Sequence, residues 1–364
     1  MIDFTSSLYL GMRHDSTVVP PWRQLTTGRP AALAEAPQAG QVAAGLAGLI
    51  GVPAATLAPS TMHAFWDLFV VLGARQIFVD AGTYPIARWG AERARCTGAA
   101  TRTFRHHDPA DLRRAAMATA GPGVAVLTDG LCPGCGGVAP VGDYLDAVRS
   151  CGGIVVVDDT QALGVLGLPA PGHPYGAGGG GITRWAGLRD PRLLIVASLA
   201  KGLGVPVAVV AGHQAAVRRY EDRAETRVHC SPPSDAHLGA AGHALRDNQR
   251  RGDELRAHLG SLVARFRGRL RAEGVMVTAG LFPVQTIAPR GRADLQDVHQ
   301  RLGELGVRAV LHRPRCEPRL ALSFIVTAAH HRAEVDRAAR AVGIALSGGP
   351  GGRPGRIPIK VGTR

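Results

Sequence analysis

The segment Ile195-Val-Ala-Ser-Leu-Ala-Lys201-Gly-Leu-Gly204 carries the residue pattern that decides the fold. The apolar run 193–197 is followed by Ser198, and a lysine comes three residues later in a glycine-rich turn. Upstream, the apolar run Ile154-Val-Val-Val-Asp158 ends in an acid. Runs that are apolar at successive positions are typical of strands buried on both faces of a sheet. We therefore predict two buried strands that place Lys201 and Asp158 just beyond their ends.

Three further runs have the same character, namely 76–80, 124–128 and 207–211, and helix-like stretches such as 83–95 and 141–151 separate the runs. Strand–helix alternation predicts an α/β fold, a three-layer structure with a mostly parallel sheet and helices on both faces. Ligands of such sheets bind beyond the carboxyl ends of the strands. The polar residues expected at that edge are Asp80, Asp129, Asp158 and Ser198.

The rest of the chain predicts a domain organisation around this sheet. We expect an N-terminal arm over 1–40, a large cofactor-binding α/β domain over 41–245, a small α+β C-terminal domain over 246–346 and a disordered basic tail over 347–364. A long helix is expected at about 235–273. The segment 168–190, with glycines at 178–181, is expected to form a flexible loop near the site.

Composition singles out one lysine. Of the 42 basic residues among 364, 40 are arginine and only Lys201 and Lys360 are lysine. Arginine cannot lose its proton in a protein, whereas a buried lysine can and then attacks carbonyl groups. Lys201 is therefore the candidate for covalent chemistry, while Lys360 falls in the expected tail.

The net charge of +14 lies mostly in the last third of the chain. An anionic partner such as nucleic acid is one explanation, and an arginine-rich solvated surface is the other. No stretch of 18 apolar residues occurs, so no membrane span is expected. The start of the chain lacks a signal-peptide pattern, and the six scattered cysteines fit a reducing cytosol. We expect a cytoplasmic protein.

The sequence predicts no metal site. Cys132-Pro-Gly-Cys135 is the only close pair of cysteines, and no second CxxC or HxxxH motif accompanies it. A turn of small residues is favoured over a functional dithiol. The 14 histidines show no metal-binding spacing, because His106-His107 and His330-His331 are adjacent pairs.

A lysine and an aspartate at neighbouring strand ends suit pyridoxal 5'-phosphate. The lysine can form the Schiff base with the cofactor's aldehyde, and the aspartate can hold the pyridine nitrogen protonated. A buried Asp–Lys ion pair without a cofactor is the alternative, at a considerable desolvation cost.

The motifs resemble those of the α-oxoamine synthases, a pyridoxal-phosphate group of fold type I related to class I and II aminotransferases. The resembling segments are 155–167, 128–140, 198–204 and 7–11. The resemblance implies an internal aldimine on Lys201, with Asp158 on the pyridine nitrogen. It also implies a homodimer with sites at the subunit interface.

The same resemblance suggests further catalytic and cofactor-binding residues. Gln161 and Tyr84 stand where the family has histidines, beside the cofactor's phenolic oxygen and stacked on its ring. Ser198 and the Ser60-Thr61-Met62 turn are candidates for the phosphate, because backbone amides at a helix N-terminus suit an anion. The family's carboxylate-binding arginine aligns near Ser323, with Arg313, Arg315 and Arg319 nearby but out of register.

These departures leave several functions open. The leading hypothesis is a pyridoxal-phosphate-dependent, aminotransferase-like transferase that acts on an amine or amino acid in a biosynthetic pathway. The alternative is an α-oxoamine synthase-type acyltransferase that condenses an amino acid with an acyl-CoA or carrier-protein thioester. A lyase or decarboxylase is also open, as is a catalytically inactive basic module that binds nucleic acid.

Overall fold

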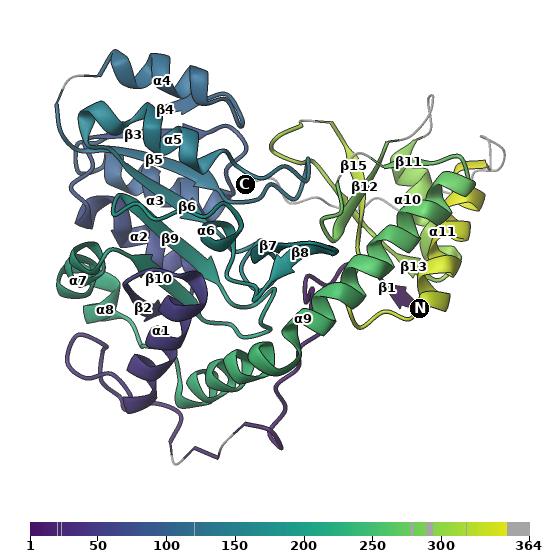
Figure 1. Cartoon of the computed structure of the whole chain (residues 1–364), viewed down its shortest axis with the longest axis horizontal. Coiled ribbons are helices and arrows are strands. Elements are labelled where there is room, and N and C mark those ends of the chain that lie inside the picture. The colour runs from purple at the N-terminus through teal and green to yellow at the C-terminus, as the bar shows by residue number, and fades with distance from the viewer. Residues whose placement is uncertain are drawn as a thin grey trace.

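A computed structural model describes residues 1–19, 21–22, 24–119, 121–277, 280–288, 294–317 and 319–347 of the chain. A large sheet with its helices lies beside a smaller C-terminal sheet, and the long helix α9 runs between them (Figure 1). The strands are β1 (Ile2–Asp3), β2 (Ala54–Ala58), β3 (Gln76–Asp80), β4 (Ala100–Phe104), β5 (Val124–Asp129), β6 (Ile154–Asp158), β7 (Leu168–Ala170), β8 (His173–Ala177), β9 (Leu193–Ser198), β10 (Ala208–Gly212), β11 (Met276–Val277), β12 (Val284–Ala288), β13 (Val307–Arg308), β14 (Val310–His312) and β15 (Ala321–Ile325).

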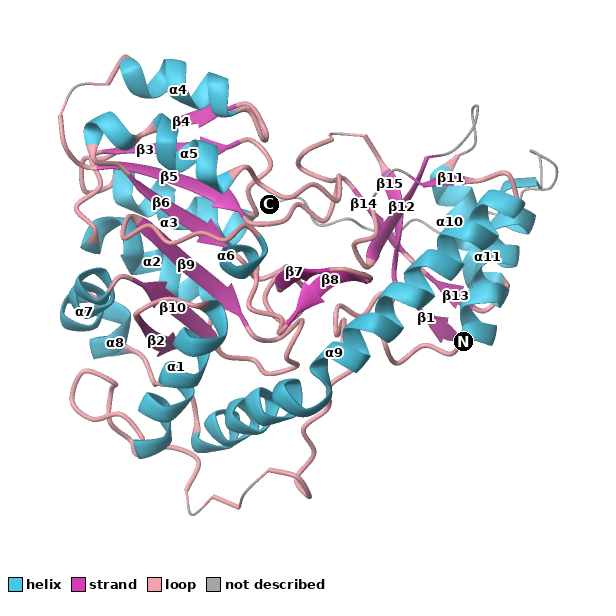
Figure 2. Cartoon of the chain, viewed as in Figure 1, coloured by secondary structure: helices cyan, strands magenta, loops and turns pink. Residues whose placement is uncertain are grey.

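The helices account for much of the remaining chain (Figure 2). They are α1 (Pro37–Ile50), α2 (Thr61–Val71), α3 (Pro85–Arg95), α4 (Pro109–Met117), α5 (Val141–Ala147), α6 (Ile182–Trp185), α7 (Gln214–Arg223), α8 (Glu225–His229), α9 (Asp235–Ala272), α10 (Leu295–Glu304) and α11 (Arg332–Ser347). A 3-10 turn at Arg149–Cys151 follows α5. Among the described residues, no helix combines the length and the apolar character needed to cross a bilayer.

The large sheet has seven strands in the order β2-β10-β9-β6-β5-β3-β4. β10 pairs antiparallel with both β2 and β9, and every other pairing in this sheet is parallel. The five predicted strands are therefore confirmed, and the sheet is mostly parallel as expected. Two strands were missed, β2 and the edge strand β4. The sequence of β4, Ala-Thr-Arg-Thr-Phe, is largely exposed and lacks an apolar run.

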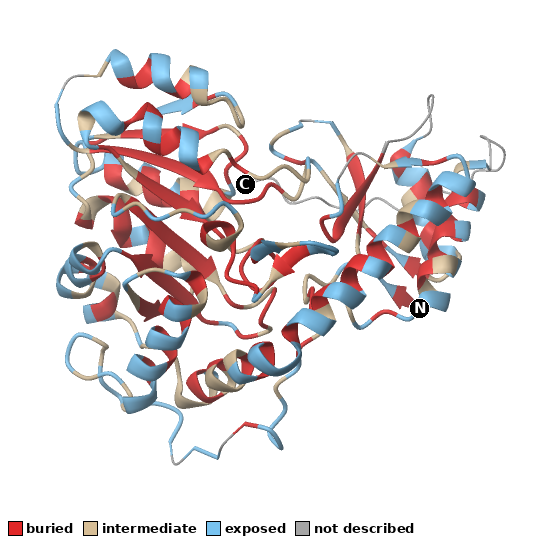
Figure 3. Cartoon of the chain, in the orientation of Figure 1, coloured by how far each residue is buried: buried red, intermediate tan, exposed pale blue. Residues whose placement is uncertain are grey.

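Successive strand residues pack on opposite faces of this sheet. Val155 and Val157 of β6 join the cluster that includes α1, α4 and α5, whereas Val156 joins the cluster that includes α2 and α3. All three valines are fully buried, and the strands lie within the buried layer in Figure 3. Helices therefore cover both faces, which confirms the predicted three-layer α/β fold.

The C-terminal sheet has the order β11-β12-β15-β14 and is antiparallel throughout. The N-terminal segment joins this part of the molecule, because β1 pairs with β13. The Phe4 ring stacks on Phe266 of α9 at 5.7 Å between centroids and on His330 at 4.3 Å. The buried His330 also contacts the backbone oxygen of Asp3 through Nε2 at 3.0 Å, so it helps to hold the N-terminal segment in place.

Two expectations differ from the structure. The segment 168–190 is not a plain loop, since it contains the hairpin β7–β8 and the short helix α6, and β8 packs against α9. Its glycines permit this packing: Gly179 has φ +76°, and a Cβ there would lie 2.5 Å from Nη1 of the buried Arg256. α9 also runs without a break across the expected boundary at 245/246. The division into domains stays a prediction, and the tail beyond Ser347 lies outside the described residues.

The aromatic cluster of Phe4, Phe266 and Phe324 yields a stability prediction. Phe266 is fully buried and its ring lies 5.3 Å from that of Phe324. Phe266→Ala should lower the free energy of unfolding by about 3–5 kcal/mol, because a large cavity forms in a packed core. Urea unfolding measures this change. The control Ile344→Ala, at a side chain 61% exposed on α11, should change stability by less than about 0.5 kcal/mol, and equal effects of the two substitutions would contradict the packing argument.

Candidate active site

The carboxyl ends of β3, β5, β6 and β9 bring polar residues together at one edge of the sheet. Asp129 pairs in register with Asp158, and Asp158 with Val196, two residues before Ser198. All three acids at this edge, Asp80, Asp129 and Asp158, are buried. Parallel strands place their carboxyl ends at the same edge, so the sheet order accounts for the cluster.

Lys201 lies in the turn beyond β9 and faces this edge. Its Nζ is 5.9 Å from the centroid of the Tyr84 ring, which follows β3. Burial lowers the pKa of the Lys201 ammonium, while the charges of Asp158 and Asp129 partly offset that fall. The amine is thus more easily deprotonated than that of an exposed lysine.

Asp158 is 6% exposed and is held by its own turn. Its Oδ1 accepts a hydrogen bond from the backbone N–H of Thr160 at 3.1 Å, and Thr160 Oγ1 accepts one from the N–H of Ser198 at 2.9 Å. These bonds connect the ends of β6 and β9. Burial raises the pKa of the Asp158 carboxyl, and hydrogen bonds to Thr160 and the charge of Lys201 oppose that rise.

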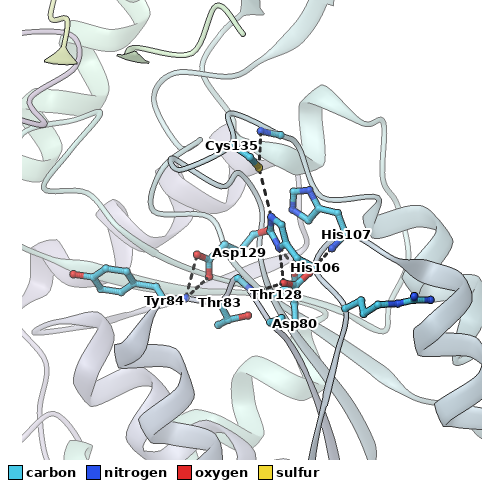
Figure 4. A network of polar contacts seen from close by, with 12 residues as sticks. Asp80, Thr83, Tyr84, His106, His107, Thr128, Asp129 and Cys135 are labelled. Atoms are coloured by element: carbon cyan, nitrogen blue, oxygen red, sulfur yellow. Dashed lines mark hydrogen bonds and ion pairs between the residues drawn. The ribbon is translucent and has the colours of Figure 1, made fainter. Parts of the chain in front are cut away.

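Asp129 is a second buried acid beside Lys201. Both of its carboxylate oxygens accept from the backbone N–H of Tyr84, at 3.1 and 3.2 Å, which orients the residue whose ring lies near Lys201 (Figure 4). Burial and the nearby charge of Asp158 raise the pKa of Asp129 well above its ordinary value. Sequence reasoning placed Asp129 at this edge but gave it no role. Its signal was the same as that of Asp158, an acid that ends an apolar run.

Gln161 follows in the turn after β6, and its Oε1 accepts a hydrogen bond from the Tyr9 hydroxyl at 2.5 Å. Tyr9 is 1% exposed and comes from the N-terminal segment, so that segment packs against the edge of the site. The contact of Tyr9 with Gln161 could not be predicted from the spacing of motifs, because 152 residues separate the two partners.

The expected phosphate candidates lie on the β9 side of the same edge. Ala208 of β10 faces Ser198 on one neighbouring strand and Ala58 on the other. Ser60, two residues beyond Ala58, caps the N-terminus of α2, where its Oγ accepts from the His63 N–H at 3.5 Å. Thr61 and Met62 form the first turn of α2. Ser198 Oγ accepts from the Ala200 N–H at 3.2 Å.

Ser323, the position where the resemblance would place a carboxylate-binding arginine, is 1% exposed in β15. Its hydroxyl lies 2.8 Å from Thr286 Oγ1 and 2.8 Å from His312 Nε2. These contacts make the position polar, but Ser323 does not supply the permanent positive charge of an arginine. Arg319 lies in an exposed loop near Glu317, with its side chain 88% exposed.

The chemical groups at this edge fit pyridoxal phosphate. They include a partly buried amine with a lowered pKa, a buried carboxylate, an aromatic ring near the amine, and hydroxyls beside a helix N-terminus. These are the groups that an aldehyde, a pyridine nitrogen, a planar ring and a phosphate dianion require.

Comparison with known sequences gives the family. The model of the family described as aminotransferase class I and II matches residues 45–342. The 8-amino-7-oxononanoate synthase of Aromatoleum aromaticum is 32% identical over 66% of this chain, and that of Halorhodospira halophila is 32% identical over 71%. These matches span 60% and 63% of the relatives' own lengths, so the chain spans less than two thirds of the curated relatives that it matches.

Solved structures show the same fold. A serine palmitoyltransferase from S. paucimobilis superposes with a TM-score of 0.82 at 17% identity, covering 94% of this chain and 87% of that one. The 8-amino-7-oxononanoate synthase from Francisella tularensis gives a TM-score of 0.74 at 19% identity, covering 95% and 97%. The chain therefore belongs to the class I and II aminotransferase family, a family of pyridoxal-phosphate-dependent transferases of fold type I.

Proposed function

We propose that the chain is a pyridoxal-phosphate-dependent transferase that acts on an amine or amino acid in a biosynthetic pathway. The position of Lys201 is the observation that carries this proposal: its partly buried amine feels the charges of Asp158 and Asp129 and lies 5.9 Å from the centroid of the Tyr84 ring. Family membership supports the cofactor. The inactive nucleic-acid-binding alternative has less support, because binding to a phosphate backbone needs neither a partly buried lysine nor a buried acid beside it.

Lys201 would carry both the attachment and the proton transfer. Burial favours its neutral form, so Nζ would be the atom that holds the cofactor through its aldehyde carbon, and the substrate amine would take the place of Nζ on that carbon. Once displaced, the same nitrogen can accept a proton from the substrate's α-carbon and return it. The charges of Asp158 and Asp129 oppose the effect of burial on the pKa of Lys201, because they favour the ammonium form.

Pyridoxal phosphate, when bound, supplies an electron sink for the carbanion formed on the substrate. Asp158 would hold the pyridine nitrogen and its proton, because a carboxylate fixed by Thr160 has little freedom to turn away. Tyr84 would lie against the ring as a catalytic and binding residue, with its backbone held by Asp129. Ser60, Thr61, Met62 and Ser198 would hold the phosphate, and Gln161 would donate to the phenolic oxygen from a side chain oriented by Tyr9.

Two candidate reactions differ in their second substrate, which is an acyl thioester in a condensation and a keto acid in amino transfer. The 8-amino-7-oxononanoate synthase relatives favour condensation of an amino acid with an acyl thioester. Ser323 in place of a carboxylate-binding arginine favours a different amine from that of the ordinary condensation. We place the acyl-thioester reaction ahead of amino transfer to a keto acid, because the sequence matches come from the condensing enzymes.

A homodimer with sites at the subunit interface is part of the proposal. Three aromatic side chains on neighbouring elements are unusually exposed for their size: Trp66 of α2, Trp89 of α3 and Tyr84 just before α3. α2 and α3 pack against each other, and Arg93 of α3 lies over the Trp66 ring at 5.0 Å from its centroid. Large exposed apolar side chains of this kind mark association surfaces.

Replacement of the attachment lysine gives the first test. Lys201→Ala should abolish covalent cofactor binding and lower turnover by more than about 10²–10⁴-fold, the loss expected from proton transfer alone. Borohydride reduction of the holoprotein, followed by peptide mapping, reads out the attachment directly. Lys360→Ala, at the only other lysine, is the matched control and should keep the cofactor. Cofactor trapped by borohydride on Lys360, or on any residue of Lys201→Ala, would contradict the assignment.

The lowered pKa of Lys201 gives a pH prediction. Only the neutral amine attacks the aldehyde, so the rate of cofactor capture by the apoprotein should rise with pH around a midpoint below about 10.4, the ordinary lysine value. Asp129→Asn removes a charge that favours the ammonium form, so the midpoint should move to lower pH. Stopped-flow absorbance measures it. Asp143→Asn, at an exposed acid of α5, should leave the midpoint unchanged, and an upward shift in Asp129→Asn would overturn the argument.

The choice between the two reactions is tested by product mass. We expect holoprotein supplied with candidate amino acids and acyl-CoA to release free CoA and a product in which the acyl and amine carbons are joined. The same amino acids with keto acids should yield no new amino acid beyond the Lys201→Ala background. Amino transfer without CoA release would instead establish the aminotransferase alternative.

A further inference from the structure

Three cysteines and a histidine from distant parts of the chain meet beside the predicted active site. Cys132 and Cys135 lie in the loop after β5, His106 follows β4, and Cys316 lies in the loop between β14 and β15. Their donor atoms all lie within 4.8 Å of one another. The active-site proposal uses none of the four, and half of the chain's six cysteines are in this cluster.

The spacing suits a tetrahedral ion. Zinc bonds of about 2.3 Å to sulfur and about 2.0–2.1 Å to nitrogen put tetrahedral ligand atoms about 3.5–3.8 Å apart. Cys135 Sγ lies 3.5 Å from His106 Nε2, which is the separation expected for two ligands of one ion (Figure 4). The remaining donor atoms lie within 4.8 Å of one another, at most about 1 Å beyond the separation expected for zinc.

His106 is held in the orientation that a metal ligand requires. Its Nδ1 lies 2.6 Å from Asp80 Oδ1, which leaves Nε2 directed at the sulfurs. Asp80 is itself fixed, because it accepts hydrogen bonds from the backbone N–H groups of Gly82 at 2.7 Å and His107 at 3.0 Å. A carboxylate on the far nitrogen of a ligating histidine sets its tautomer and strengthens its bond to the ion.

The cysteine loop is also shaped around the sulfurs. The Gly137 N–H donates to Cys135 Sγ at 3.4 Å, a contact that stabilises a thiolate, and the Gly136 N–H donates to the Cys132 carbonyl at 2.8 Å. The absence of a side chain at Gly134 leaves space for Cys316, since a Cβ at position 134 would lie 2.5 Å from Cys316 Sγ. A side chain at 134 would therefore push the third cysteine away.

We propose that Cys132, Cys135, Cys316 and His106 bind one Zn²⁺ ion as a structural site. Three thiolates and an imidazole are ligands that zinc prefers, and four protein ligands leave no open position for a substrate. The sequence predicted no metal site because only the CxxC pair is close in the chain. His106 lies 29 residues before Cys135, and Cys316 comes from the C-terminal part, so the fold alone brings the set together.

The ion would fasten the β14–β15 loop to the edge of the large sheet. Cys132 follows Asp129 by three residues, and Asp80 lies at the end of β3, so two of the strand ends that form the active site also support the cluster. Removal of the ion should therefore release the β14–β15 loop and lower the melting temperature, because a structural metal contributes directly to folding.

Metal analysis of the purified full-length holoprotein tests the proposal. We expect about one zinc per chain after growth with added zinc, and a marked loss of metal in Cys135→Ser and Cys316→Ser. These two residues are chosen because Cys132 is buried and its replacement can prevent folding. Cys96→Ser, at an exposed cysteine outside the cluster, is the control and should keep the zinc.

Cobalt gives a second measurement that is independent of activity. Reduced apoprotein titrated with Co²⁺ should develop thiolate charge-transfer absorption and the intense bands of a tetrahedral ion, and Cys316→Ser should weaken the charge-transfer band while Cys96→Ser leaves it unchanged. The proposal would be overturned if the reduced, metal-free protein developed no such spectrum on addition of Co²⁺. An intact mass showing that two of these cysteines form a disulfide, or zinc retained equally by Cys316→Ser and wild type, would also overturn it.

Discussion

The partial burial of one amine near two buried acids is the constraint on which the active-site edge depends. Removing a charged group from water is costly unless partner charges compensate it. At this edge, burial and the attraction between opposite charges have opposite effects on the protonation states. Burial drives Lys201 toward its neutral form and Asp158 and Asp129 toward their protonated forms, whereas their mutual attraction favours the charged forms. The balance leaves an amine that can react and acids that can share protons. A cationic ring bound beside Asp158 would relieve the unfavourable part of this arrangement.

The parallel sheet is what makes such a concentration of acids feasible. Asp80, Asp129 and Asp158 each end a strand whose preceding residues are buried on both faces, so their backbones are fixed before any ligand binds. The turns then supply hydrogen-bond donors: Gly82 for Asp80, Tyr84 for Asp129 and Thr160 for Asp158. Backbone N–H groups of the neighbouring turns therefore hold each acid, and the His106 ring is a further partner of Asp80. Among the described contacts, Lys201 makes no direct hydrogen bond to any of the three acids.

Sequence reasoning could identify the strand ends because their signal is local. The apolar runs that precede Asp158 and Ser198 are strands buried on both faces, and such runs stand out in a single sequence. The edge strand β4 was missed for the converse reason, since one exposed face allows Thr and Arg to replace the apolar pattern. The contact between Tyr9 and Gln161 and the approach of Cys316 to Cys132 depend on how distant segments pack. No spacing along the chain encodes such contacts.

Asp80 and Asp129 give the two sites a common support. Asp80 bonds His106 on one side, and its charge is felt at Asp129, which in turn holds the Tyr84 backbone near Lys201. An ion bound by His106 would draw electron density from the imidazole and strengthen its bond to Asp80, as metal ligation does for a histidine paired with a carboxylate. Asp80 is therefore a support shared by the cysteine cluster and the active-site edge, because it bonds His106 directly and acts on Asp129 through its charge.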